Sequence, residues 1–149
     1  MKSASAPSIT FWLIAIILLL WGIAGASIYV AYFLETPQEF ALTAETAANR
    51  DAYAEYIANI PLWAIAVGIV AAVARLLGAI ALLFRSAWAL PFYLASLPFF
   101  LMALYRAFAL ADVAKIMSIG HIATEVVFFL LSVFAVWFAY KSKTNGTLK

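Results

Sequence analysis

The chain has 149 residues, of which 68% are hydrophobic and only 11% are charged, with a formal net charge of +2. A soluble domain of this size cannot bury so much apolar surface, and a disordered chain requires low hydrophobicity. The small, scattered positive charge excludes a nucleic-acid-binding surface. We therefore expect an integral membrane protein surrounded by the lipid bilayer.

The rare residue types exclude several kinds of site. The chain has no cysteine and one histidine, His121, which excludes disulfides, thiolate catalysis and any metal site built from several cysteines or histidines. No phosphate-binding loop and no nucleophile constellation is present. We expect no metal and no cofactor, and we regard a role other than catalysis as the better interpretation.

Four apolar runs are each long enough for a spanning helix, which needs ~20 residues. They cover about 11–34, 62–84, 87–110 and 119–140. We predict an all-α integral membrane protein, a four-transmembrane-helix bundle that forms one domain over 1–149. Ala24-Gly25-Ala26 also resembles a signal-peptide cleavage site, but the first run continues through Leu34, which favours a retained span.

The connections between the runs differ in length. Little more than Arg85 and Ser86 separates the second run from the third, so these two spans form an antiparallel hairpin. The segment 35–60 is longer and acidic, with one arginine, Arg50, against several carboxylates. We interpret it as a broken, amphipathic segment on the membrane or over the end of the bundle, with a solvated loop as the alternative.

Two helical pieces are predicted within that segment. Thr36-Pro37-Gln38-Glu39 has the pattern of a capping box with proline at the first helical position. Asn49 is a candidate cap for the second piece. On that piece, one face at helical spacing carries Tyr53, Tyr56, Ile57 and Ile60.

Lysine and arginine predict the orientation, because cytoplasmic loops of membrane proteins are enriched in both. With both termini cytoplasmic, five basic residues lie inside: Lys2, Arg85, Lys141, Lys143 and Lys149. Three then lie outside: Arg50, Arg106 and Lys115. We predict cytoplasmic termini, an external amphipathic segment and a basic cytoplasmic tail over 141–149.

Arg75 stands near the middle of the second span, where a charge costs at least ~2.5 kcal/mol. Small residues beside it favour an orientation into the bundle. Pro98 in the third span leaves the carbonyl of Leu94 without its helical donor, so Arg75 can donate to Leu94 or to Ser96. The alternative is an anchor for an anion in an interior cavity, and a pair with Glu125 also stays open.

A second polar group is expected in the external half of the bundle. His121 and Glu125 are one helical turn apart in the fourth span, and Arg106 is at a similar depth in the third. We predict that these three residues form one intramembrane polar cluster with Arg75 as a further candidate site residue. The cluster is either a salt bridge between spans or a proton- or cation-responsive site.

Short motifs in the first three spans resemble those of a known family. They are Phe11-Trp12-Leu13, Leu20-Trp21 with Gly25, Ile60-Pro61-Leu62-Trp63-Ala64, Leu82-Leu83-Phe84-Arg85-Ser86-Ala87-Trp88-Ala89, Pro91 and Ser96-Leu97. The chain resembles a family of small bacterial four-span inner-membrane proteins that are often labelled sugar transporters. The resemblance implies a location in the bacterial inner membrane. The family often has asparagine after a tryptophan of the first span, where Gly22 follows Trp21 in this chain.

Three functions are compatible with these patterns. The first is a carrier of a small polar solute that works as a homo-oligomer, since buried charges and broken helices line substrate paths. The second is an accessory subunit of a larger membrane complex. The third is a small membrane enzyme for an apolar substrate that uses Arg106, His121 and Glu125.

Overall fold

The computed structural model describes residues 7–43 and 50–149, and every regular element in that part of the chain is helical. The long helices are α1 (Ile9–Leu34), α4 (Leu62–Leu83), α5 (Ala89–Tyr105), which continues as the π-helix η1 (Arg106–Leu110), and α6 (Ile119–Thr144). All four are long and apolar enough to span a membrane. The predicted spans are therefore confirmed as helices, with ends that differ by a few residues.

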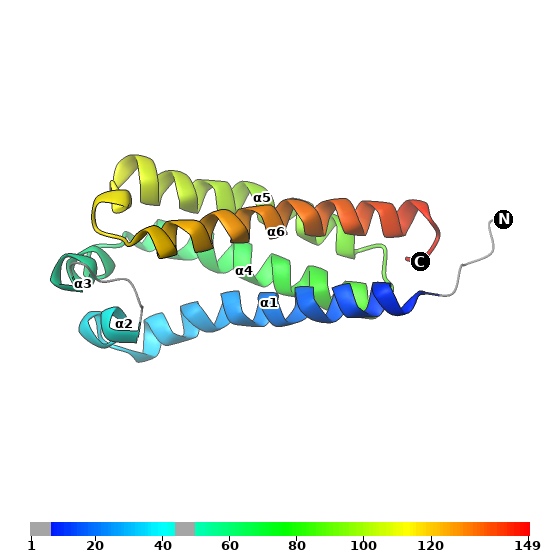
Figure 1. The fold of residues 1–149 in the computed structure, drawn as a ribbon, viewed down its shortest axis with the longest axis horizontal. Coiled ribbons are helices and arrows are strands. Elements are labelled where there is room, and N and C mark those ends of the chain that lie inside the picture. The colour runs from blue at the N-terminus through cyan, green and yellow to red at the C-terminus, as the bar shows by residue number, and fades with distance from the viewer. Residues whose placement is uncertain (1–6, 44–49) are drawn as a thin grey trace.

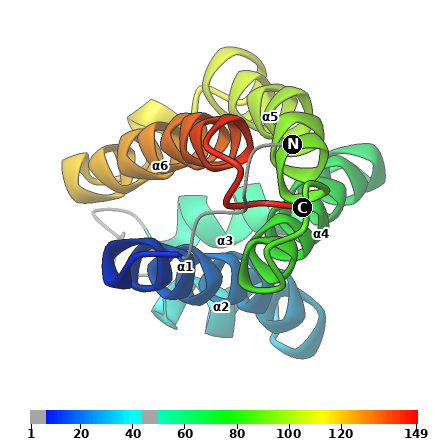
Figure 2. The ribbon, with the colours of Figure 1, turned by 90° about the vertical axis from the view of Figure 1, so that its right-hand side faces the viewer.

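The four long helices lie side by side in one bundle (Figure 1). Helix α4 packs closely against α1 and α5, and α5 also packs against α6. Helices α4 and α6 lie diagonally across the bundle, and a wider space separates α1 from α6 (Figure 2). Aromatic pairs bridge that space, with ring centroids 5.7 Å apart for Phe11 and Phe138 and 6.2 Å apart for Trp21 and Phe128.

The half of the bundle that holds the C-terminus is filled by side chains. Its core combines small residues with a few large ones, among them Ala79, Leu82, Ala89, Tyr93 and Ala135. Small residues let helices approach closely where the surroundings are lipid. Large apolar side chains on all four helices are exposed outward, as a lipid-facing surface requires.

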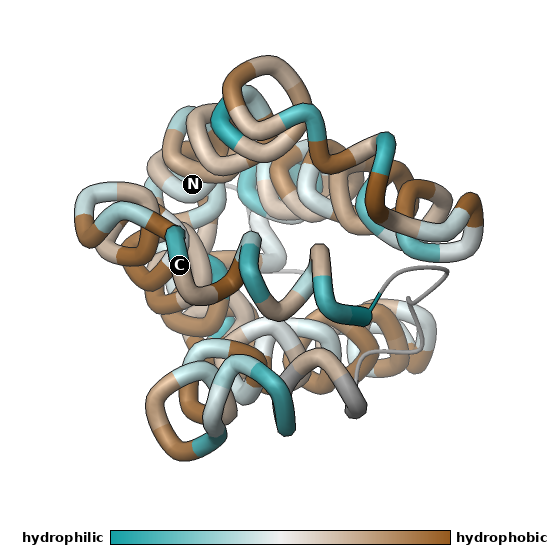
Figure 3. Tube along the Cα trace, turned by 90° about the vertical axis from the view of Figure 1, so that its left-hand side faces the viewer, coloured by the Kyte–Doolittle hydropathy of each residue, from teal (hydrophilic) through white to brown (hydrophobic). Residues whose placement is uncertain are grey.

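The opposite end of the bundle carries the short helices α2 (Pro37–Thr43) and α3 (Arg50–Ala58) and the 3-10 helix η2 (Val113–Lys115). Figure 3 faces this end and shows hydrophilic residues among its short segments. The predicted capping box is confirmed, because the Thr36 backbone N–H donates to Glu39 Oε2 at 2.8 Å and the Glu39 N–H donates to Thr36 Oγ1 at 3.3 Å. The Thr36 hydroxyl also donates to Glu39 Oε2 at 2.8 Å, and the two bonds that Oε2 accepts from Thr36 lower the pKa of the Glu39 carboxyl. Asn49, the expected second cap, lies outside the described residues.

The end of the chain departs from the predicted basic tail over 141–149. Helix α6 continues to Thr144, with Lys141 and Lys143 in its last turn, where cations stabilise a helix C-terminus. The following residues fold back onto the turn between α4 and α5. The Lys149 N–H donates to the Arg85 carbonyl, and the Ala87 N–H donates to the Lys149 carbonyl, both at 2.7 Å.

Candidate functional site

The half of the bundle next to α3 contains a cavity of about 890 Å³. Side chains from α1, α3, α4, α5, η1 and α6 line it. Tyr53 and Ile57 of α3 are buried and close the end of the cavity. The exposed lining residues lie on α1, at Ser27 and Ile28, and on α6, at Gly120 and Thr124, so the opening lies between these two helices.

Arg75 contributes a guanidinium to the wall formed by α4. The residue is 5% exposed, and its Cζ lies 4.5 Å from the centre of the Trp21 ring and 5.2 Å from that of Phe100. Nη1 lies 3.7 Å from the point where a Cβ on Gly25 would stand, an ordinary van der Waals distance, so the guanidinium packs against α1 at Gly25. Within residues 7–43 and 50–149, Arg75 forms no ion pair and no hydrogen bond.

Arg75 does not donate to either partner expected from the sequence, the Leu94 carbonyl or Ser96. Pro98 does lie inside α5, but Leu94 on that helix is half exposed. Ser96 is buried, and its hydroxyl donates to the Tyr93 carbonyl at 2.8 Å rather than accepting from Arg75. The guanidinium therefore lies against two aromatic rings, and its N–H groups donate no hydrogen bond within the described residues.

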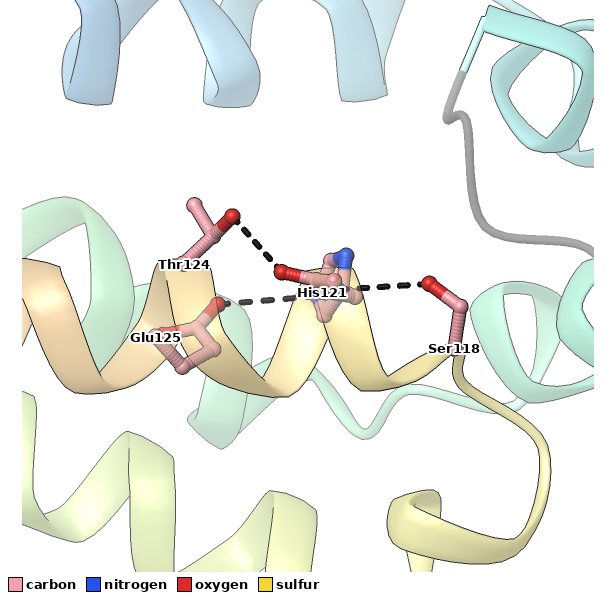
Figure 4. A network of polar contacts seen from close by, with 5 residues as sticks. Ser118, His121, Thr124 and Glu125 are labelled. Atoms are coloured by element: carbon pink, nitrogen blue, oxygen red, sulfur yellow. Dashed lines mark hydrogen bonds and ion pairs between the residues drawn. The ribbon is translucent and has the colours of Figure 1, made fainter.

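His121 and Glu125 are brought together on α6, as their spacing predicts. Nε2 of His121 lies 3.7 Å from Oε1 of Glu125, and both side chains line the cavity (Figure 4). Ser118 caps the helix by accepting the His121 backbone N–H at 3.2 Å, which fixes the first turn. Glu125 is also close enough to Arg75 for their charges to attract, although no ion pair joins them in the described part of the chain.

Arg106 is placed apart from this pair. It does not line the cavity, and its guanidinium lies 4.6 Å from the centre of the Tyr56 ring, on the side of α3. Arg106 is the first residue of the π-helix η1, where the wider turn changes which face of the helix each residue occupies. The predicted position of Arg106 beside His121 and Glu125 assumed a regular α-helix, and so it did not include this rotation.

Tyrosines supply most of the remaining polar groups. Tyr53 and Tyr56 stack with centroids 6.0 Å apart, and Tyr53 meets the edge of His121 at 6.3 Å. Burial raises the pKa of Tyr53 to about 12 and also raises the pKa of Tyr56. Both hydroxyls therefore keep their protons at neutral pH and offer O–H donors at the cavity.

Sequence reasoning missed two of these features. The first is Trp21, whose ring lies against the Arg75 guanidinium. The second is Tyr29 on α1, whose hydroxyl and ring occupy the space left by Gly68 on the neighbouring helix α4. Nothing in the sequence of one helix signals such a contact with another.

Comparisons with protein-family models, with characterised proteins and with solved structures found no match for this chain. The fold of the described residues gives the class: they form an all-helical structure with four helices long and apolar enough to cross a membrane. The described residues hold no cluster of three or more metal-ligating His, Cys, Asp or Glu side chains.

Proposed function

We propose that this protein is a small membrane carrier that binds a polar solute with an anionic group inside its cavity. One observation supports this most strongly: Arg75 is buried at the cavity wall and has no carboxylate or carbonyl partner among the described residues. A buried guanidinium is costly unless it is paired, and its planar set of donors matches a carboxylate. A solute carboxylate supplies the missing partner.

The two halves of the bundle suit a carrier. The cavity lies in the half covered by α3 and opens between α1 and α6, and among the described residues a packed apolar core fills the other half. A carrier exposes its binding site to one side of the membrane at a time. One chain contains the whole cavity, so we expect binding by a single protomer, while passage beyond the core requires helix movement or the homo-oligomer.

The arrangement gives less support to an enzyme. The acid–base set expected for that function combined Arg106, His121 and Glu125, and Arg106 contacts Tyr56 rather than the cavity. A role as an accessory subunit has no observation in its favour among the described residues. The carrier is therefore the function that we propose.

Uptake into proteoliposomes tests the carrier function. We expect purified protein to accelerate entry of at least one radiolabelled carboxylate from a panel of butyrate, succinate and γ-aminobutyrate, compared with liposomes without protein. Replacing Arg75 by glutamine should remove the acceleration, and replacing the exposed Lys143 should not. Equal rates with and without protein for every carboxylate would contradict the proposal, and uptake of glucose instead would favour the resemblance to proteins labelled sugar transporters.

We also propose that α3 faces the outside of a bacterial inner membrane and that both termini face the cytoplasm, as the basic residues indicate. The chain has no cysteine, so single cysteines report accessibility directly. We expect a membrane-impermeant maleimide to label Glu55→Cys on α3 from outside the cell, and Lys143→Cys only after permeabilisation. Both positions are exposed. The reverse labelling pattern would overturn this orientation.

A further inference from the structure

Two opposite charges share the cavity without neutralising each other. Arg75 lies on α4 and Glu125 on α6, which are diagonal across the bundle (Figure 2). Both line the cavity and their charges attract, yet the only ion-pair partner of Glu125 in the described chain is His121 at 3.7 Å. A charge pair with a purely structural role gains most from direct contact. The space between these two charges is therefore available to a ligand.

The two charges also differ in their distance from the opening. Glu125 directly follows the exposed Thr124 on α6 and lies one turn after the partly buried His121, beside the opening between α1 and α6. Its Cα is roughly 9 Å from the start of α6 at 1.5 Å per residue, whereas the Cα of Arg75 is roughly 20 Å from the start of α4. The Arg75 guanidinium is level with Gly25, deeper in the bundle. A solute that enters meets the negative pole first and the positive pole last.

We propose that the solute is a small zwitterion, with a carboxylate that binds Arg75 and an ammonium group that binds Glu125. This inference rests on the proposed function and names its substrate class. A simple anion at Arg75 leaves Glu125 with His121 as its one ion-pair partner in the described chain and is repelled by Glu125, and a simple cation is repelled by Arg75. A zwitterion satisfies the buried Arg75 and the partly buried Glu125 at once.

The aromatic side chains fit the same ligand. Tyr29, Tyr53 and Tyr56 line the cavity. Tyrosine faces attract an ammonium group, and their hydroxyls donate to carboxylate oxygens. The Arg75 guanidinium already occupies the rings of Trp21 and Phe100, and the Arg106 guanidinium occupies the ring of Tyr56. Tyr29 and Tyr53 are therefore the tyrosine rings that we assign to the ligand's cation.

Calorimetric titration of the full-length protein in detergent micelles tests the substrate class. The probes are γ-aminobutyrate, butyrate, which lacks the amine, and propylamine, which lacks the carboxylate, with glycine, β-alanine and 5-aminopentanoate to vary the distance between charges. We expect at least one amino acid of the series to bind tenfold or more tightly than both butyrate and propylamine. Glu125→Gln should reduce that preference over butyrate to less than threefold.

Glu55→Gln provides the matched control, because Glu55 is an exposed carboxylate on α3 that does not line the cavity, and it should keep the preference. Butyrate binding as tightly as every amino acid would overturn the zwitterion and leave the carrier function intact. An amino-acid preference that survives in Glu125→Gln would overturn the assigned role of Glu125. Absence of binding by any carboxylate contradicts the carrier function itself.

Discussion

Replacement of Arg75 by methionine is expected to abolish solute binding while changing the free energy of unfolding by no more than about 2 kcal/mol in either direction. Methionine has a similar length and fills the space against Trp21 and Phe100 without the cost of a charge in the middle of a span, at least ~2.5 kcal/mol. The opposing loss is the attraction of the guanidinium to two rings, about 0.5–2 kcal/mol each. Reversible unfolding in mixed micelles measures the balance.

A structural role for Arg75 makes the opposite prediction. Removing one partner of a satisfied buried pair typically costs 3–5 kcal/mol. A loss of that size in Arg75→Met, with solute binding retained in the folded fraction, would assign Arg75 to stability and remove the basis of the carrier proposal. Arg75→Lys is the matched control for charge, since it keeps the cation but loses the planar fork, and it should weaken binding without abolishing it.

Replacement of Gly68 by alanine is expected to destabilise the bundle by about 1–3 kcal/mol, the usual cost of inserting a methyl group into an occupied space. The added Cβ would lie 2.0 Å from the Tyr29 hydroxyl and 2.6 Å from its Cζ, so the ring must leave its place on α4. Because Tyr29 lines the cavity, solute affinity should fall together with stability. The same unfolding and binding measurements report both effects.

The pair Gly68 and Tyr29 allows an internal check. Shortening the second residue in Tyr29→Leu should relieve the clash, so the double variant should be more stable than the sum of the single effects by about 1–3 kcal/mol. Gly120→Ala is the control for helix propensity, since a Cβ there meets only Ser118 Oγ at an ordinary 3.7 Å. It should be neutral or slightly stabilising. Additive effects of Gly68→Ala and Tyr29→Leu would show that the steric contact is not what destabilises Gly68→Ala.

Local patterns predicted the helices and several of the polar contacts within them. Thr36 and Glu39 pair because a capping box needs only residues three positions apart. His121 and Glu125 meet because residues four apart share a helix face. The tight turn at Arg85 and Ser86 follows from two apolar runs with almost nothing between them.

The contacts between helices were beyond the reach of these patterns. Arg106 was expected beside His121 and Glu125. The π-helix that begins at Arg106 changes the direction of the side chain, and the guanidinium lies against the Tyr56 ring. Ser96 was a candidate partner for Arg75, yet its hydroxyl bonds to the carbonyl of Tyr93 three residues back, a choice that helical Ser often makes. Depth along a helix is predictable from counting, whereas rotation about its axis is not when the helix contains an irregular turn.

The sequence by itself determined that this is a protein of four apolar helices and that Arg75, Arg106, His121 and Glu125 are the costly residues within them. Hydropathy and helical period are properties of one segment, so they can be read without a partner. Only the tertiary structure decided that Arg75 lies between Trp21 and Phe100 at the wall of a cavity, facing the Glu125 charge without touching it. That arrangement depends on how far α1 and α6 stand apart and on the fit of Tyr29 against Gly68, which are properties of packed helices together.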